Sequence, residues 1–322
     1  MSEREVTAHE TGIVPSGLDR SQAPFTSRHV MVSDSFIHYI DEGSGPPILL
    51  IHGVPVSSFV YRHLVSDLRA DFRCIAPDLP GFGLSQAAPA FGYRAKDHED
   101  VLSGLVEKLD LRNLLVMGHD WGGPLALRLA IRHRDRVNGI VLGNTWAWPN
   151  HGAARRPYFR AATSSAAGYA LQASNLFTRL AIRWAGRRLH LEEGAEAAYC
   201  GQHPTRASRR ANTTLIRQNG ENVRGTDTYM HELEQSLPGL QDLPVLLTWG
   251  ARCPIFREDD RAKFEEAFPR HTTVVVRAGA HFAMEDSPTV VAAAIRTWST
   301  SRSPAALGPK DRQPQAGFPA PG

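Results

Sequence analysis

Cysteine is scarce in this chain of 322 residues, which contains three, at positions 74, 200 and 253. They are far apart and form no CxxC pair, so neither a zinc knuckle nor a disulfide framework is indicated. The HExxH motif of zinc hydrolases is also missing, and we expect no metal site. No apolar run is long enough to cross a bilayer, and residues 1–27 lack the apolar segment of a secretory signal. These absences predict a soluble, cytoplasmic protein that has no contact with a membrane.

A large excess of one charge is missing as well. The chain has 36 Lys and Arg against 33 Asp and Glu, a formal net charge of +3. No block rich in Lys or Arg stands out as a dedicated arm. We therefore expect no nucleic-acid partner.

What the chain does contain is a series of short apolar runs that end in turn residues. Between most of these runs lie helical patterns, such as the one over Lys96–Leu109. Alternating strands and helices predict an α/β fold with a mostly parallel sheet covered on both faces. The residues that follow each strand are where chemistry is expected, because ligands bind at the carboxyl ends of such strands. The runs are Pro47–Ile51, Phe72–Ala76, Asn113–Met117, Gly139–Leu142, Val245–Trp249 and Thr272–Val276.

The alternation stops after residue 146, and a helical stretch of roughly ninety residues without clear strands separates two sheet strands, which is far longer than an ordinary connection. We interpret residues 147–238 as a helical cap inserted into a core made of residues 28–146 and 239–300. Residues 1–27 form an N-terminal arm. Residues 301–322 are rich in Pro, Gly and Ala and predict a disordered tail.

The most specific motif is Gly118–Gly123, with the sequence GHDWGG. It lies between a strand pattern and the helical pattern of Pro124–His133, which is the spacing of a nucleophile elbow. The position of the nucleophile holds Asp120, where serine is usual. A carboxylate that attacks a saturated carbon displaces a halide or an epoxide oxygen and leaves an alkyl ester, which water must then hydrolyse. The elbow therefore predicts displacement at a saturated carbon.

Four further stretches accompany the elbow: HYIDEG at 38–43, HGVPVSSFVYR at 52–62, PDLPGFGLS at 77–85 and GNTWAWP at 143–149. Together with the elbow they resemble the haloalkane dehalogenases, which belong to the aspartate-nucleophile branch of the α/β-hydrolase fold. The resemblance runs from about residue 38 to about residue 298. Epoxide hydrolases share the elbow, whereas the segment 57–62 favours a dehalogenase.

The resemblance implies an α/β-hydrolase fold and chemistry without a cofactor. Asp120 would displace halide from a small apolar substrate, and His281 would activate the water that hydrolyses the ester. The backbone N–H groups of Val54 and Trp121 would form an oxyanion hole, and the indole of Trp121 would bind the halide. Two alternatives remain: an epoxide hydrolase that uses the same Asp–His pair, and a catalytically impaired family member that binds a small apolar ligand.

The acid that should orient His281 is missing from both positions where the family places it. These positions hold Cys253, after the strand at 245–249, and Asn144, after the strand at 139–142. Neither residue carries a stable negative charge as a carboxylate does. Both are candidates for the partner of His281, and Cys253 could fill this role as a thiolate beside an imidazolium. The carboxylates nearby in sequence are candidates to replace it: Glu258, Asp259, Asp260, Glu285 and Asp286.

Val54 also departs from the family, because many members have Asn there as a second halide donor. The cap would then supply the donor, and Trp184 within it and Trp146 and Trp148 at its base are candidates. Tyr158 is a further cap residue for the pocket. An epoxide hydrolase needs two cap tyrosines, and Ile216 lies about where the second is expected, which disfavours that alternative.

Overall fold

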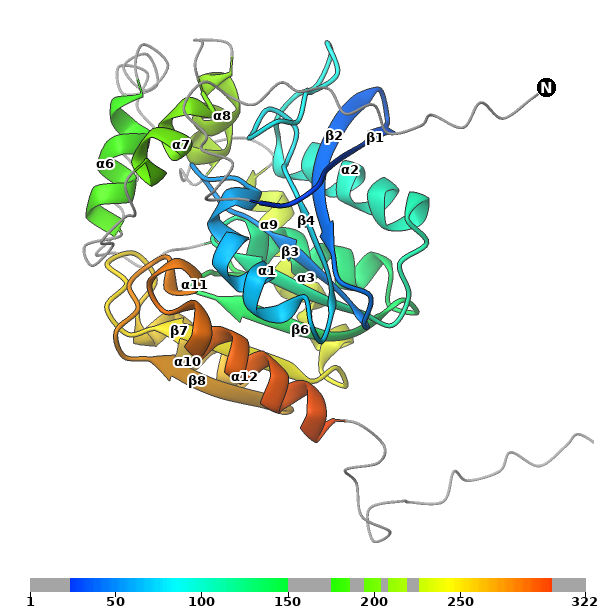
Figure 1. The fold of residues 1–322 in the computed structure, drawn as a ribbon. Helices are drawn as coiled ribbons and strands as arrows, with labels where there is room; N and C mark the ends of the chain where they lie inside the picture. Colours follow the sequence, from blue (N-terminus) through cyan, green and yellow to red (C-terminus); the bar gives the residue numbers. More distant parts are fainter. Residues whose placement is uncertain (1–23, 150–174, 186–193, 204–207, 219–225, 303–322) are drawn as a thin grey trace, which may run out of the picture.

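The computed structural model describes residues 24–149, 175–185, 194–203, 208–218 and 226–302. The described residues form an eight-stranded sheet of order β1-β2-β4-β3-β5-β6-β7-β8 (Figure 1). Strands β3 to β8 pair in parallel, and β1 and β2 add an antiparallel edge. The strands are β1 (Ser27–Val32), β2 (Ser35–Glu42), β3 (Pro47–Ile51), β4 (Arg73–Pro77), β5 (Leu114–His119), β6 (Val137–Gly143), β7 (Val245–Gly250) and β8 (His271–Val276).

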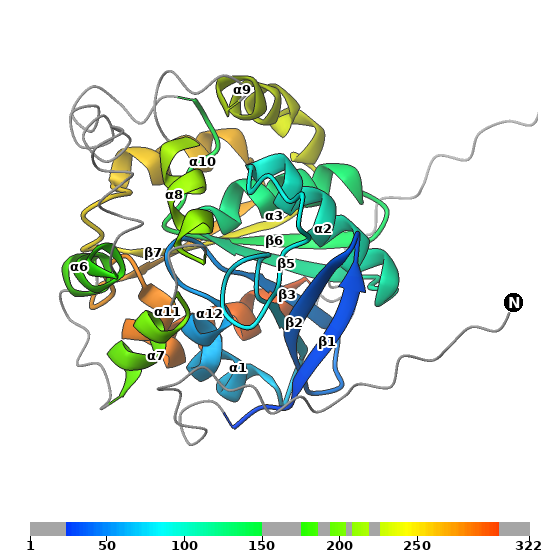
Figure 2. The ribbon, with the colours of Figure 1, turned by 90° about the horizontal axis from the view of Figure 1, so that it is seen from above.

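Helices cover both faces of this sheet. Figure 2 shows α2, α3, α9 and α10 on one side and α1 and α12 on the other. The predicted α/β class, with a mostly parallel sheet between two helical layers, is therefore confirmed. The helical elements are η2 (Ser58–Tyr61), α1 (Arg62–Leu68), α2 (Ala95–Lys108), α3 (Gly122–Arg132), α6 (Leu176–Ala185), α7 (Ala195–Gly201), α8 (Arg209–Gln218), α9 (Thr226–Ser236), η3 (Leu237–Leu240), α10 (Glu258–Ala267), α11 (Ala283–Asp286) and α12 (Pro288–Ser301). None of the helices in the described ranges is long and apolar enough to span a membrane.

The core follows from the alternation of side chains along the central strands. In β3, Leu49 and Ile51 pack into the cluster under α2 and α3, whereas Ile48 and Leu50 pack into the cluster under α1 and α12. Successive side chains of a strand point to opposite faces, so a strand buried on both faces must be apolar throughout. This is why the continuous apolar runs of the sequence mark the parallel strands.

The antiparallel edge was not predicted from the sequence. Strand β1 is half exposed, only Val32 in it is buried, and its apolar residues are confined to the last three positions. A tight turn joins it to β2, and both turn residues, Ser33 and Asp34, have positive φ angles of 45° and 62°. Two left-handed residues in a two-residue loop match the twist of a hairpin. The pairing of the two strands, rather than their hydrophobicity, identifies them.

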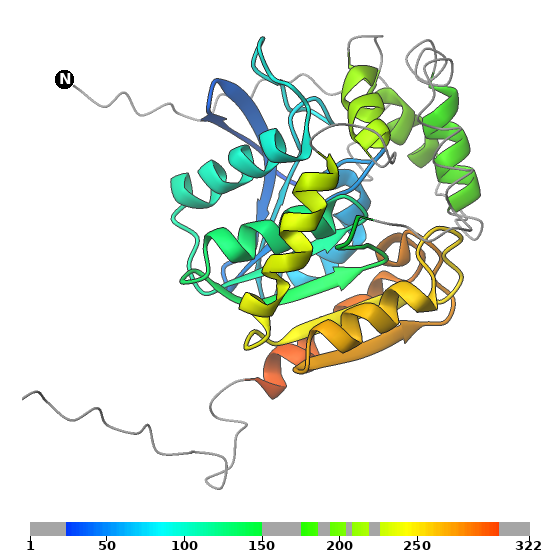
Figure 3. The same ribbon diagram turned by 180° about the vertical axis from the view of Figure 1, so that it is seen from behind.

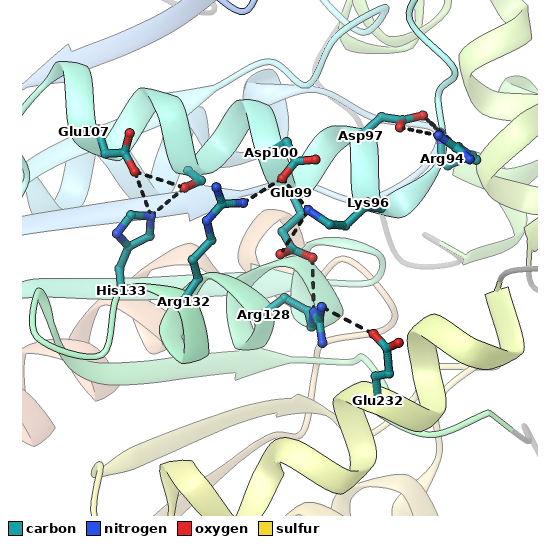
Figure 4. Close-up of polar contacts among 11 residues, drawn as sticks. Arg94, Lys96, Asp97, Glu99, Asp100, Glu107, Arg128, Arg132, His133 and Glu232 are labelled. Carbon is teal, nitrogen blue, oxygen red and sulfur yellow. Dashed lines mark hydrogen bonds and ion pairs between the residues drawn. The ribbon is translucent and has the colours of Figure 1, made fainter.

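The end of the predicted cap needs a correction. The range 147–238 includes α9, which lies beside α3 on the face of the sheet (Figure 3, yellow-green). Arg128 of α3 links the two neighbouring helices, with its Nε 3.1 Å from an oxygen of Glu99 on α2 and its Nη2 3.6 Å from an oxygen of Glu232 on α9 (Figure 4). Helix α9 thus packs against helices of the core, and we propose that, within the described residues, the cap consists of α6, α7 and α8.

Tyr199 of α7 contacts a buried ion pair of the core. Arg62 donates two hydrogen bonds, of 2.7 and 2.5 Å, to Glu285, and the hydroxyl of Tyr199 on α7 donates a third at 2.8 Å. The side chains of Arg62 and Glu285 are only 1% and 3% exposed. The charges of this pair are therefore balanced within the protein and not by solvent.

We expect Glu285→Gln to lower the free energy of unfolding by about 3–5 kcal/mol, because it leaves the guanidinium of Arg62 buried without a counter-charge. Chemical denaturation of the wild type and the variant measures this loss. Glu258→Gln is the control, since Glu258 is 82% exposed and pairs with Arg261 at the surface. Equal stabilities of the two variants would contradict the prediction.

Candidate active site

The predicted elbow is present between β5, which ends at His119, and α3, which begins at Gly122. Asp120 occupies the turn with a φ of 53°, in the left-handed region. A Cβ at Gly118 would lie 2.2 Å from the carbonyl oxygen of Gly122, and one at Gly122 would lie 2.0 Å from that of Ile51. Only glycine fits these two positions, so the motif is dictated by the close approach of the backbones.

The carboxylate of Asp120 is held by the loop after β3. Its Oδ1 accepts a hydrogen bond of 3.0 Å from the N–H of Val54. The hydroxyl of Thr145 donates to the main-chain oxygen of Asp120 at 2.6 Å, which secures the turn from the end of β6. Burial raises the pKa of Asp120 to about 7, although the N–H groups of Val54 and Trp121 oppose this by stabilising the anion.

His281 lies in the turn between β8 and α11, with 2% of its surface exposed. Its Nε2 is 3.7 Å from Oδ2 of Asp120, so the structure brings together the two residues that the sequence places 161 positions apart. Burial lowers the pKa of His281 well below its usual value, and nearby His119 adds to this effect. His281 is therefore a neutral imidazole at pH 7, which can accept a proton.

His119 supports the position of His281 through a contact with its backbone. Its Nε2 lies 2.9 Å from the carbonyl oxygen of His281, and the two rings are 4.5 Å apart. Burial lowers the pKa of His119 to about 3, so its ring is neutral. The contact joins the end of β5 to the turn that carries His281.

Cys253 occupies the other side of the imidazole. Its Sγ is 3.4 Å from Nδ1 of His281, and the N–H of Phe256 donates to the same sulfur at 3.2 Å. Asp120, His281 and Cys253 thus form one continuous line of side chains. The sequence pointed to Cys253 as the occupant of an acid position and as a candidate thiolate partner of His281. It did not reveal the contribution of Phe256, because a backbone donor leaves no signal in residue type.

Asn144, at the second acid position, has a different set of partners. Its Nδ2 donates to the carbonyl oxygen of Gly250 at 3.2 Å, and its Oδ1 accepts from the N–H of the same residue at 2.8 Å. Both amide groups are used to join the end of β6 to the end of β7. The prediction that Asn144 acts as a partner of His281 is therefore corrected: it bonds to backbone.

The five carboxylates that could replace the acid have roles elsewhere. Glu258 and Asp259 are exposed at the start of α10, where Glu258 pairs with Arg261 at 2.9 Å. Their nomination as substitutes is corrected, since exposed side chains at a helix start do not lie against a buried imidazole. The remaining three bind other groups: Asp260 accepts from the N–H of Arg257, Glu285 pairs with Arg62, and Asp286 accepts from the N–H of Ala280.

Trp121 contributes a buried donor beside the carboxylate. Its ring is 1% exposed and meets that of Trp146 edge to face at 4.9 Å, and Trp146 in turn stacks on Phe256. Among the residues that the structure describes, the buried indole nitrogen of Trp121 has no hydrogen-bond partner. A buried N–H with no acceptor is uncommon, and an anion at this position would satisfy it.

The structure describes only some of the remaining cap candidates. Trp148 packs on Phe264 of α10 at 4.7 Å, with the ammonium of Lys263 5.1 Å from its ring centre. Trp184 belongs to α6, but its side chain lies outside the described residues, and Tyr158 lies outside them altogether.

Comparison with known proteins places the chain in a class. Residues 46–288 match the family of the alpha/beta hydrolase fold, in agreement with the sheet and the elbow. The chain is 39% identical over 274 residues to haloalkane dehalogenase 2 of Mycobacterium tuberculosis, covering 84% of this chain and 94% of the relative. It is 33% identical over 278 residues to the haloalkane dehalogenase of Sphingobium indicum, covering 83% and 93%. Within the alpha/beta hydrolases, the chain belongs to the haloalkane dehalogenase family.

A solved structure shows the same fold. A loop variant of the haloalkane dehalogenase from Bradyrhizobium elkanii superposes with a TM-score of 0.74 at 24% identity, covering 88% of this chain and 98% of that one.

The raised pKa of Asp120 predicts how stability depends on pH. The pKa rises from 3.8 to about 7 on folding, so the protonated carboxyl stabilises the fold at low pH, and this stabilisation is lost as the pH rises to about 7. Between about pH 5 and about pH 8, we expect the wild type to lose about 2–3 kcal/mol relative to Asp120→Ala. Denaturation of both proteins across this range measures the difference, with Asp259→Ala as control. A difference that does not change with pH would contradict the prediction.

Proposed function

We propose that this protein is a cofactor-independent haloalkane dehalogenase that acts on small apolar halogenated substrates. The observation that carries the proposal is the placement of Asp120, with Oδ1 held by the N–H of Val54 and Oδ2 turned toward Nε2 of His281. A carboxylate at an elbow favours displacement at a saturated carbon. The similarity to two dehalogenases over most of the chain supports this choice.

In the first half-reaction, Oδ2 of Asp120 attacks the carbon that bears the halogen. A carbon–oxygen bond forms, the carbon–halogen bond breaks, and the halide leaves with the bonding electrons. The indole N–H of Trp121, which has no partner within the described ranges, is the donor that receives this anion. Because only the ionised carboxyl attacks, the rate of halide release should rise as the pH passes the Asp120 pKa of about 7.

In the second half-reaction, water attacks the carbonyl carbon of the ester while Nε2 of His281 takes its proton. The charge that develops on Oδ1 is stabilised by the N–H of Val54, which already binds that atom, together with the N–H of Trp121. The alkoxide leaves as the alcohol with the proton from His281. The oxygen atom of the water remains in the carboxylate of Asp120.

This atom balance provides the test. A single turnover of a bromoalkane such as 1-bromobutane in ¹⁸O water, with enzyme in excess, should place the label in the peptide that contains Asp120. The alcohol formed in that turnover should carry no label. Bromide and butanol should appear in equal amounts. Label in the alcohol instead, or no bromide release, would overturn the proposal.

Two described positions disfavour the epoxide hydrolase alternative. The hydroxyl of Tyr199 donates to Glu285, and Ile216 is buried in α8 within the core cluster. Formation of a diol from epoxybutane, with no bromide release from bromobutane, would favour that alternative. An alkyl ester that forms on Asp120 and never decays would favour the impaired family member.

A further inference from the structure

The tautomer of His281 decides whether it can act as a base. Its Nε2 faces Asp120 at 3.7 Å, so this nitrogen must carry the lone pair that takes the proton from water. The proton of the neutral ring then belongs on Nδ1, which faces Sγ of Cys253 at 3.4 Å. The productive tautomer therefore needs a sulfur that accepts a hydrogen bond.

A protonated thiol favours the wrong tautomer. If Cys253 donates its S–H to Nδ1, the ring proton moves to Nε2, and that nitrogen cannot take a proton from water. A thiolate can only accept, so it holds the proton on Nδ1. The ionisation of the sulfur thus selects between an inactive and an active imidazole.

The surroundings of Cys253 favour its role as acceptor. The N–H of Phe256 already donates to Sγ at 3.2 Å. The sulfur is buried, with 7% of the residue exposed, so little water competes for it. These contacts resemble those of an orienting carboxylate more than those of a packed apolar cysteine.

The titratable groups around Cys253 come from three segments. His281 faces it from the turn after β8, and the ring of His119, at the end of β5, lies 4.5 Å from that of His281 in a tilted arrangement. Asp120 lies on the far side of the imidazole. On the loop of Cys253 itself, the flanking charged residues Arg252, Arg257 and Glu258 are exposed.

We propose that Cys253 is the positioning residue of His281, and that its thiolate form takes the place of the missing carboxylate. This inference rests on the proposed function and concerns only its second half-reaction: hydrolysis of the ester on Asp120 requires the thiolate, whereas halide release does not. An ordinary thiol ionises near pH 8.5, far above a carboxyl group. The hydrolysis step of this enzyme should therefore have an alkaline dependence on pH.

The experiment follows the two steps separately in a single turnover, from about pH 6 to about pH 10, a range that brackets ordinary thiol ionisation. Bromide release reports alkylation of Asp120, and intact mass reports decay of the ester. In the wild type, ester decay should rise at least tenfold across this range. Cys253→Asp should be flat across it and at least tenfold faster than the wild type near neutral pH, since a carboxylate is ionised throughout.

Cys253→Ser is the matched control, because a hydroxyl has nearly the same shape but does not ionise. It should still release bromide in the first turnover, decay at least tenfold more slowly than the wild type at alkaline pH and lose the alkaline rise. It should also lack the part of the ultraviolet thiolate absorbance that Cys253 contributes in the wild type over the same range. The difference in absorbance between the wild type and the variant reports the ionisation of Cys253 directly. If Cys253 served packing alone, its replacement by serine would change neither the pH profile of ester decay nor the ultraviolet thiolate signal.

The outcomes separate the two proposals. Bromide release without an alkaline rise in ester decay, or a Cys253→Ser profile equal to that of the wild type, overturns the role of Cys253 and leaves the dehalogenase assignment in place. No bromide release in the wild type at any pH overturns both.

Discussion

Halide release is expected to fall by at least about 10⁴-fold in Asp120→Ala, because the variant has no atom that can attack the carbon. Water bound at the site cannot substitute, since the hydrolytic water is activated to attack a carbonyl carbon that exists only in the ester. Steady-state bromide release from bromobutane measures the loss. Alanine also has to adopt the left-handed φ of 53°, so Asp120→Asn is needed beside it. Asparagine tolerates that conformation and keeps the shape of the side chain.

Two controls make this result specific. Asp259→Ala removes an exposed carboxylate from the start of α10 and should retain the activity of the wild type. Circular dichroism should show that the Asp120 variants are folded, and peptide mass should show that the amide of Asp120→Asn persists. Retained halide release in folded Asp120→Ala would remove Asp120 from the mechanism.

The second large effect is expected in His281→Phe, in which the two half-reactions should separate. Alkylation of Asp120 does not use the imidazole, so one halide per active site should be released. Hydrolysis of the ester should slow by about 10²–10⁴-fold, the usual contribution of a general base. Intact mass should then increase by the mass of the alkyl group minus one proton, and fragmentation should place the addition on Asp120.

A second histidine serves as the matched control for this variant. His231 lies on α9 with its side chain 59% exposed, and His231→Gln should turn over like the wild type. Multiple turnovers by His281→Phe at the rate of the wild type would show that another group activates water. Absence of even a single halide release would show that the imidazole is needed for alkylation or for the shape of the site.

Most of the sheet could be predicted from the sequence, because the parallel strands are buried on both faces and must be apolar throughout. The predicted run 47–51 coincides with β3, and the other five runs lie within two residues of their strands at each end. The hairpin of β1 and β2 escaped prediction because β1 lies at the edge, where exposure permits polar residues, and because β2 buries polar side chains such as His38, whose partners come from other segments. The predicted cap included α9 because a helical sequence pattern looks the same in a cap and in a core layer. Only the contact of α9 with α3 shows that it covers the sheet.

The residue types alone determined the nucleophile and its class of chemistry. Asp120 sits between glycines that the strand-to-helix turn requires, and this requirement is local, since it concerns backbone atoms within a few residues or in the adjoining strand. The absence of a carboxylate at residues 144 and 253 is likewise apparent from the residue types alone. The roles of Asn144 and Cys253 were beyond it, because each depends on which atoms another segment brings within hydrogen-bonding distance.

Only the tertiary structure shows which of Asn144 and Cys253 contacts His281. The end of β7 presents its backbone to Asn144, which uses both of its amide groups there, while the loop after β7 presents Cys253 to Nδ1 of His281. Burial then set the ionisation, raising the pKa of Asp120 to about 7 and lowering that of His281, through the desolvation that the whole fold imposes. The sequence by itself determined which groups react, and the packing of distant segments decided their partners and their charge, because hydrogen bonding and desolvation are properties of neighbours in space.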